Sequence, residues 1–235
     1  MAATSIRICL IGSRGRMGRA IAAAAHRVHG VLIAAEVDAD DSVEAGFQEC
    51  DVGIDFSAAA AIEKICGAAR ALERPLVIGT TGHSAAQREK IKEHSTAIPI
   101  LMASNFSLGV NALFWLTARA AQLLGRSFHA EIEETHHIMK KDAPSGTAKT
   151  LAEILQSERG GEDVPVRSIR EGEVVGEHIV SFSGPGEQLE LIHRAESRET
   201  FAVGALTAAK WIVNKPPGLY SMHDVLGLTR DDPRG

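Results

Sequence analysis

The sequence predicts an α/β fold with a parallel sheet, followed by a second domain of the α+β class. Up to about residue 107, short β-branched runs alternate with alanine-rich stretches, which is the rhythm of βαβ units. The runs themselves are almost wholly apolar, as expected for strands that helices cover on both faces. Beyond this point, polar strands with glycine-rich turns replace the alternation and indicate the α+β domain.

The first domain is expected to begin with a strand that leads directly into a helix, and this unit then repeats. Each expected strand is a short apolar run, and each expected helix is an alanine-rich or polar stretch of helical length. The expected strands cover residues 6–11, 31–37, 52–56, 76–78 and 98–102, and the expected helices cover 16–29, 58–72 and 85–94.

The second domain is expected to combine helices with polar strands. Its expected elements are a helix over 110–124, a strand over 128–135, a helix from Pro144, strands between 166 and 194, and a helix over 200–213. A Lys-Pro-Pro-Gly segment at 215–218 would end the last helix, and the apolar residues after it suit a tail that packs on the first domain. The expected domains are therefore 1–107 with 217–235, and 108–216 between them.

Composition and charge exclude several classes of protein. The chain has 235 residues, of which 45% are hydrophobic, and a net charge of −5, which gives no general attraction to nucleic acid. No run approaches the roughly 20 apolar residues that span a bilayer. The N-terminus has no secretory pattern, so we expect a soluble, cytoplasmic protein. The three cysteines lack CxxC spacing and are expected to be buried free thiols, with no metal site.

A glycine-rich segment lies where the first strand meets the first helix. It reads Gly12-Ser13-Arg14-Gly15-Arg16-Met17-Gly18. Glycines at such a turn let the backbone approach a pyrophosphate, whose charge is then held by the amides and dipole of the helix N-terminus. The spacing is GxxGxxG, because Ser13 stands where GxGxxG has its first glycine. A helix-capping turn without a ligand is the alternative, and the placement in a βαβ unit favours a dinucleotide.

The residue expected to bind the adenosine ribose is Asp38. It lies at the end of the second strand, 20 residues after Gly18, where a carboxylate can accept hydrogen bonds from ribose hydroxyls. Asp38 and the following Ala39 offer no cation, so they disfavour a 2′-phosphate and point to NADH. Arg14 in the glycine loop is the residue that would permit NADPH as well, so both cofactors stay open.

Two further loops follow expected strands. Gly79-Thr80-Thr81-Gly82 comes after the strand at 76–78, and Ala103-Ser104-Asn105-Phe106 comes after the strand at 98–102. Ligands of open α/β sheets bind at these carboxyl ends of strands. Plain turns at the same places need no ligand, so the two loops support the dinucleotide site without carrying it alone.

The segment from residue 131 to 148, EIEETHHIMKKDAPSGTA, joins a strand, a cationic loop and a helix start. Pro144 fits the first helical turn. The amides around Ser145, Gly146 and Thr147 would then be unpaired donors at a positive helix end. Such a terminus can bind a carboxylate, so the segment predicts a site for an acidic small molecule.

The cationic loop adds His136, His137, Lys140 and Lys141 just before this helix. Together with the helix end, these residues offer a pocket for an anion and groups that can transfer a proton. Paired histidines can also bind a metal, but two lysines would place cations against it, and no further ligand completes a known spacing. A solvated charged loop is the other alternative, and the DAPSGTA sequence that follows argues against it.

These motifs resemble those of one known family. THHxxKxDAPSGTA is similar to the signature of the 4-hydroxy-tetrahydrodipicolinate reductases, and GxxGRMGR, VIGTTG and ASNFSLGVN resemble that family's other motifs in the same order. The resemblance extends through EGEVVGEH and HRAESRETFAVGA to the closing LYSMHDVLGL. It implies an NADH- or NADPH-dependent oxidoreductase that reduces 4-hydroxy-tetrahydrodipicolinate, with loss of water, in diaminopimelate and lysine biosynthesis. It also implies a Rossmann-type dinucleotide-binding domain, a second domain for the dicarboxylate substrate and for oligomerisation, and a homotetramer.

The resemblance also implies roles for individual residues. His136 would be a proton donor or acceptor, and Lys140 would be the second proton donor. The residues implied in substrate binding are His137, Ser145, Gly146, Thr147 and Thr81. The residues implied in cofactor binding are Gly12, Ser13, Arg14, Gly15, Arg16, Met17, Asp38, Gly79, Thr80, Thr81, Ala103, Ser104, Asn105 and Phe106.

Two loops, at 38–52 and 170–176, are shorter than the family pattern. The shorter loops remove no motif residue. They are expected to affect how the protein covers the adenosine end of the dinucleotide and how the subunits contact one another. Two other functions stay open: a different Rossmann dehydrogenase of a small carboxylate, and a catalytically silent dinucleotide-binding sensor. The helix-start motif argues against the first, and the joint presence of His136, His137 and Lys140 argues against the second.

Overall fold

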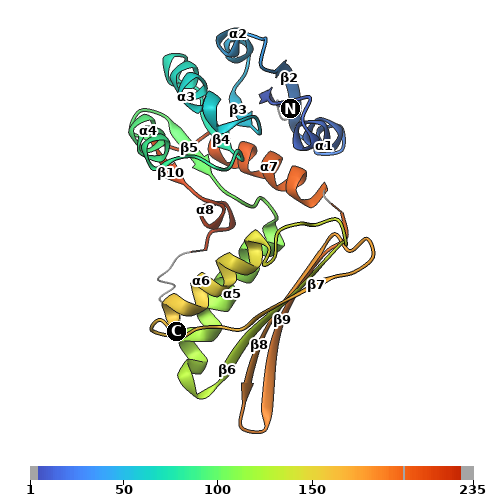
Figure 1. Ribbon diagram of the computed structural model, residues 1–235. Helices are drawn as coiled ribbons and strands as arrows, with labels where there is room; N and C mark the ends of the chain where they lie inside the picture. Colours follow the sequence, from blue (N-terminus) through green and yellow to red (C-terminus); the bar gives the residue numbers. More distant parts are fainter. Residues whose placement is uncertain (1–4, 198, 229–235) are drawn as a thin grey trace. The chain divides into compact units, whose positions relative to one another are not determined.

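The computed structural model describes residues 5–197 and 199–228 (Figure 1). The described residues fall into two compact units. One holds those up to Ser107 and from Glu199 onward, and the other begins at Leu108. Among the described helices, none has the length and apolar character needed to cross a bilayer.

The first unit is built on a six-stranded, fully parallel sheet with the order β10-β5-β4-β3-β1-β2. Helices α2, α3 and α4 pack on one face of this sheet, and α1 and α7 pack together on the other (Figure 1). The strands are β1 (Ile6–Ile11), β2 (Val31–Val37), β3 (Val52–Asp55), β4 (Leu76–Ile78), β5 (Pro99–Met102) and β10 (Gly218–Tyr220). The helices are α1 (Arg16–Ala25), α2 (Val43–Gln48), the short 3-10 turn η1 (Ala59–Ala61), α3 (Ile62–Ala71), α4 (Ala85–Ser95), α7 (Glu199–Ile212) and α8 (Met222–Leu226).

Burial on both faces explains why the central strands are apolar. Every residue of β3 and β4 is buried, and side chains such as Ile8, Leu10 and Ile78 are fully inaccessible to solvent. Each such side chain stabilises the fold by roughly 1.5–3 kcal/mol relative to exposure. The parallel sheet predicted from the alternating pattern is therefore confirmed.

Apart from shifts of one residue, the elements between Ile6 and Met102 differ from the expectation in three ways. Helix α1 ends at Ala25, four residues before the expected end, and the expected helix at 58–72 is split into η1 and α3. Helix α2 was not expected at all. It has only six residues and begins at Val43, after the N-cap residue Ser42, whose Oγ accepts a hydrogen bond from the amide of Ala45 at 3.2 Å. A helix this short shows too little periodicity to be recognised in a sequence.

The second domain boundary also differs from the expectation. The sequence placed residues up to 216 in the second domain, whereas α7 packs in the first unit. A Cβ at Gly204 would lie only 1.8 Å from the carbonyl oxygen of Phe106, and Lys210 Nζ donates to the carbonyl of His29 at 2.9 Å. The small residues along α7 permit this close approach. The strand β10 then adds to the sheet beside β5.

The second unit is a four-stranded mixed sheet with two helices on one face (Figure 1). Its order is β7-β6-β8-β9; β6 and β7 are parallel, and the other two pairs are antiparallel. The elements are α5 (Leu108–Leu124), the 3-10 turn η2 (Gly125–Ser127), β6 (His129–His136), α6 (Gly146–Glu158), β7 (Val166–Arg170), β8 (Gly176–Gly184) and β9 (Glu187–Ala195). This arrangement agrees with the predicted α+β class.

Candidate active site

The glycine loop closes against the end of the neighbouring strand. Gly12 has a φ of +80°, and a Cβ there would lie 2.5 Å from the carbonyl oxygen of Phe56, so only glycine fits. Gly15 is the N-cap of α1 and has no side chain to cap the helix. The first turn of α1, which begins with Arg16 and Met17, contains no acidic residue. Its amides are therefore suited to an anionic ligand.

Asp38 lies beside this loop, as the sequence predicted. Its carboxylate accepts a hydrogen bond from Ser13 Oγ at 2.5 Å and one from the amide of Arg14 at 3.2 Å. Arg14 Nε lies 3.6 Å from the same carboxylate, and the Arg14 side chain is otherwise exposed. One acidic and one basic side chain thus lie together where a ribose and its 2′-substituent are expected.

The three loops predicted to bind the dinucleotide meet around Phe56, which the sequence reasoning did not single out. Its carbonyl contacts Gly12, its ring lies against Gly79, and the rings of Phe56 and Phe106 have centroids 5.4 Å apart. The signal in the sequence was the position of Phe56 directly after a buried strand, at the same edge of the sheet as the other loops.

The residues of the loops after β4 and β5 differ in their exposure. Thr80 is buried, Thr81 and Ser104 are exposed, and Ala103 and Asn105 are half-buried.

A cavity of about 310 Å³ adjoins the glycine loop and is lined by Gly12, Gly15, Asp38, Phe56 and Lys64, among others. It lies where the strand order reverses, because β1 pairs with β2 on one side and with β3 on the other. Open α/β sheets bind nucleotides at such a point. The cavity, the glycine turn, the start of α1 without a side-chain cap and the Asp38 carboxylate together fit a nicotinamide dinucleotide.

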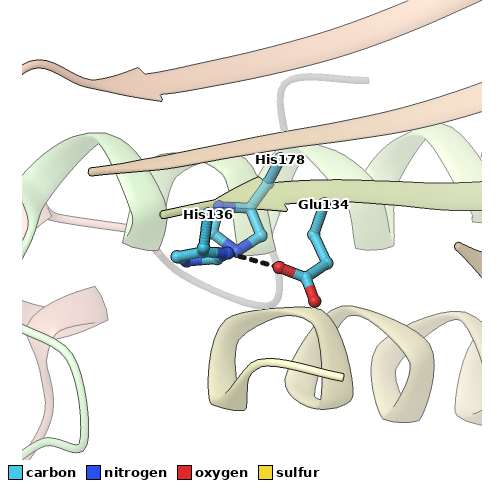
Figure 2. Close-up of side chains that lie close together, drawn as sticks. All are labelled: Glu134, His136 and His178. Atoms are coloured by element: carbon cyan, nitrogen blue, oxygen red, sulfur yellow. Dashed lines mark hydrogen bonds and ion pairs between the residues drawn. The ribbon is translucent and has the colours of Figure 1, made fainter. Parts of the chain in front are cut away.

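In the second unit, the site lies at the end of β6. Alternate residues of this strand face the helices, and the last two of them are the buried Glu134 and His136. Figure 2 shows the Glu134 carboxylate directed at the imidazole of His136, with His178 of β8 beside it. Glu134 Oε2 and His136 Nδ1 are hydrogen-bonded. The rings of His136 and His178 meet edge to face, with centroids 5.1 Å apart.

Arg170 at the end of β7 joins this cluster to the cationic loop. Its guanidinium donates to Glu134 Oε1 at 2.9 Å. It also donates to the carbonyl oxygens of Asp142 at 2.5 Å and of Lys140 at 3.3 Å. Lys140 Nζ forms an ion pair with Asp142 at 2.8 Å. The loop that carries Lys140 is thus fixed to the strand that carries His136.

The helix start differs in detail from the expectation. Helix α6 begins at Gly146 with Ser145 as its N-cap, so Pro144 lies before the first turn. Ser145 is not an unpaired donor, since its amide donates to Glu134 Oε1 at 3.3 Å and its Oγ accepts from the amide of Ala148 at 3.2 Å. Ser145 Oγ also contacts Nε2 of His178 at 3.1 Å. The positive end of α6 is therefore anchored to the same cluster.

Three other residues predicted to bind substrate, His137, Gly146 and Thr147, lie close by in the chain, whereas Thr81 lies in the first unit. His137 is half-buried, and its amide donates to the carbonyl of Val174 at 2.7 Å. Gly146 is exposed and Thr147 is half-buried in the first turn of α6. The structure thus gathers His136, Lys140 and the start of α6 at one end of the sheet of the second unit.

Charge in the cluster follows from burial and hydrogen bonding. Burial favours the neutral acid, but hydrogen bonds from Arg170, Ser168 and His136 outweigh it and hold the pKa of Glu134 below its usual value. Burial lowers the pKa of His136, and the carboxylate of Glu134 opposes that shift. Burial, reinforced by His136, lowers the pKa of His178 to about 3, so His178 is neutral at pH 7.

Glu134, His136 and His178 are close enough to share a metal ion, but each is already engaged. The carboxylate is paired with Arg170, His136 is hydrogen-bonded to Glu134, and His178 contacts Ser145. A cation placed among them would also face the guanidinium of Arg170. The donor set therefore suits proton transfer better than metal binding.

Comparison with known protein families accounts for nearly the whole chain. The model described as "Dihydrodipicolinate reductase, N-terminus" matches residues 6–106, and "Dihydrodipicolinate reductase, C-terminus" matches residues 109–226. This chain belongs to the dihydrodipicolinate reductase family. The family predicted from the sequence motifs is therefore confirmed.

Several relatives match over nearly the full length of both chains. The chain is 45% identical to the 4-hydroxy-tetrahydrodipicolinate reductase of Akkermansia muciniphila, over 96% of this chain and 99% of the relative. It is 41% identical to that of Aquifex aeolicus, over 95% and 100%. The dipicolinate-bound dihydrodipicolinate reductase from Paenisporosarcina sp. TG-14 has a TM-score of 0.81 at 20% identity, over 93% of this chain and 98% of that one. That likeness confirms the Rossmann-type fold with its second domain.

Proposed function

We propose that this chain reduces 4-hydroxy-tetrahydrodipicolinate to tetrahydrodipicolinate with NADH or NADPH, a step of diaminopimelate and lysine biosynthesis. The reaction consumes one hydride and one proton and releases one water molecule. The observation that carries the proposal is the cluster around His136, where a buried carboxylate, an anchored helix start and a cationic loop meet. This cluster lies in a chain of the dihydrodipicolinate reductase family.

The second unit offers what a dianionic ring requires. The positive end of α6 attracts a carboxylate, and Lys140 and the neighbouring histidines add positive charge or hydrogen-bond donors. We assign the substrate carboxylates to His137, Ser145, Gly146 and Thr147. Ser145 acts through its position at the helix start, because its amide and hydroxyl already have partners.

His136 and Lys140 are the proposed proton donors. The bound nicotinamide supplies the hydride, and a proton must reach the carbon next to the one that receives it. An imidazolium or an ammonium can deliver this proton. Lys140 is held by Asp142 at 2.8 Å, which keeps its ammonium group on the loop next to His136.

We assign dinucleotide binding to the first unit. The proposed contacts come from the glycine loop, from Asp38 and from the loops after β4 and β5. Thr81 is proposed to contact the dinucleotide, the substrate or both. The proposed residues are Gly12, Ser13, Arg14, Gly15, Arg16, Met17, Asp38, Gly79, Thr80, Ala103, Ser104, Asn105 and Phe106.

Arg14 is expected to decide whether NADPH is used. Its guanidinium lies 3.6 Å from Asp38 and is otherwise exposed, so it can turn toward a 2′-phosphate that the carboxylate alone would repel. Arg14→Ala is expected to raise the KM for NADPH about 10-fold more than the KM for NADH, since one charge-assisted contact is lost. Arg19→Ala, on the exposed side of α1, is the matched control. Equal discrimination by wild type and Arg14→Ala would refute this role.

The decisive test is oxidation of NADH or NADPH at 340 nm in the presence of freshly generated 4-hydroxy-tetrahydrodipicolinate. We expect turnover that depends on both substrates. Cofactor binding without turnover would favour a dinucleotide sensor. Turnover only with a different small carboxylate would favour another Rossmann dehydrogenase.

We also propose a cytoplasmic homotetramer. Cys9, Cys50 and Cys66 are buried free thiols, which suits a reducing compartment. The face of the second unit's sheet that is not covered by α5 and α6 carries exposed side chains, including those of Glu131 and Ile192, and gives room for another copy of the chain. Light scattering that gives the mass of one chain would rule the tetramer out.

A further inference from the structure

Two charged residues next to His136, Glu134 and Arg170, are assigned to neither the substrate nor the cofactor in the proposed function. Glu134 is fully buried, and Arg170 forms an ion pair with it at 2.9 Å. Burying a charged pair costs free energy unless its remaining hydrogen-bonding groups are satisfied. Here they are satisfied by other parts of the site, because Glu134 also binds His136 and the amide of Ser145. The pair is thus connected to His136, to the start of α6 and to the loop that carries Lys140.

The two oxygens of Glu134 have different partners. Oε1 accepts from Arg170 and from the amide of Ser145, and Oε2 contacts Nδ1 of His136. A carboxylate can only accept, so Nδ1 must carry the proton. In the neutral imidazole, Nε2 is then the nitrogen without a proton. Gly176 on β8 lies opposite Nε2. A side chain at position 176 would cover this nitrogen, because even its Cβ would lie 3.1 Å from Nε2, and glycine leaves it uncovered.

Arg170 performs a second task on the backbone. It donates to the carbonyl oxygens of Lys140 and Asp142, at 3.3 Å and 2.5 Å. These two residues are also joined by their side chains. The position of the Lys140 ammonium relative to His136 therefore depends on the guanidinium that pairs with Glu134.

We infer that Glu134 and Arg170 are the positioning residues of the site: Glu134 fixes His136 with Nε2 available to the substrate, and Arg170 holds the loop that carries Lys140. This inference rests on the proposed function for its kinetic consequences. The imidazole orientation itself does not depend on which reaction the chain catalyses.

Several groups determine the charge on His136. They are Glu134 on its own strand, Arg170 on β7, His178 on β8 and Lys140 on the loop; His193 on β9 acts on His178. Only Glu134 is negative, so its carboxylate is what favours the imidazolium against burial and the neighbouring cations. Loss of this charge lowers the pKa of His136. Because a protonated His136 donates the proton, the alkaline limb of kcat then moves to lower pH.

Glu134→Gln tests the inference directly. Arg170 and the Ser145 amide both require an oxygen at Oε1, so the new amide nitrogen must face Nδ1 of His136. It would force the proton onto Nε2, the opposite tautomer. We expect kcat to fall about 10- to 100-fold, as for loss of a carboxylate that orients a functional histidine, with KM for the dinucleotide unchanged.

Glu133→Gln is the matched control. Glu133 is the preceding residue of β6, faces away from α6 and pairs with Arg167 at 3.1 Å. This substitution makes the same chemical change one residue away from Glu134, and we expect the variant to keep the kcat and pH dependence of the wild type.

A second pair of variants tests Arg170. Arg170→Lys should keep more activity than Arg170→Met, because lysine retains the positive charge opposite Glu134.

The readout that is independent of activity is 15N NMR of the histidine rings in the full chain. The signals of His136, one of ten histidines, are assigned by their loss in His136→Gln. We expect the Nδ1–H tautomer in wild type and in Glu133→Gln, and the Nε2–H tautomer in Glu134→Gln. A wild-type Nε2–H tautomer would overturn the inference, and this result does not depend on whether Glu134→Gln folds. Unchanged kcat and pH dependence in a folded Glu134→Gln would also overturn it. Absence of reductase activity in the wild type, with the Nδ1–H tautomer present, would instead reject the proposed function.

Discussion

Lys140→Met is expected to lower kcat about 10²- to 10⁴-fold, the range for loss of a general acid. The substitution keeps most of the apolar stem and removes the ammonium that pairs with Asp142. The affinity for NADH should not change, because the proposed dinucleotide contacts lie in the first unit. The measurements are steady-state kcat and the dissociation constant for NADH, obtained by fluorescence titration.

Lys141→Met is the control for this experiment. Lys141 is the next residue, is exposed, and carries the same charge. If Lys140 acts only by attracting an anionic substrate, both variants should raise KM and neither should greatly lower kcat. Comparable kcat values for Lys140→Met and Lys141→Met would therefore remove Lys140 from the proton-transfer step.

Gly204→Ala is expected to destabilise the protein by roughly 3 kcal/mol, the upper end for an overpacked core position. The added Cβ would lie 1.8 Å from the carbonyl oxygen of Phe106, and backbone on both sides leaves little room to adjust. The clash should also weaken NADH binding, because it displaces the Ala103–Phe106 loop. Urea unfolding and an NADH titration measure the two effects.

Gly67→Ala is the same substitution at another position, and we expect it to stabilise the protein instead of destabilising it. Gly67 lies within α3, and a Cβ there has no neighbour within 4 Å. Alanine is the better helix former by about 0.8–1.0 kcal/mol, so the free energy of unfolding should rise by about that amount. A Gly204→Ala variant as stable as Gly67→Ala would mean that α7 does not pack as closely on Phe106 as the structure indicates.

Most of the first unit could be predicted from the sequence. Strands β1 to β5 are apolar runs bounded by turns, and each of their ends lies within one residue of the expected range. The glycine loop and Asp38 were also expected to be neighbours, because a βαβ unit brings the ends of β1 and β2 together. The assignment of α7 to the second domain was wrong. Its small residues indicate that the helix packs closely on a neighbour, but they do not indicate which unit that neighbour belongs to.

The candidate site was predicted only in part. His136, Lys140 and the start of α6 carry recognisable chemistry and were singled out, whereas Glu134 and Arg170 were not. Charged residues in a strand are usually exposed. The available signal was the two-residue spacing from Ala130 through Ile132 and Glu134 to His136, which places an acid on the buried face. The partner of that acid lies 36 residues away on β7, a distance over which local patterns give no information.

The contacts of Phe56 constrain how the first unit can change. One residue supports three segments, since its backbone carbonyl contacts the segment after β1 and its ring contacts those after β4 and β5. Substitutions in these segments should not combine additively, since each alters the surface on which the others rest. Adaptation of the chain to a different coenzyme would then require coordinated replacements, with single changes often neutral or harmful until their counterparts appear.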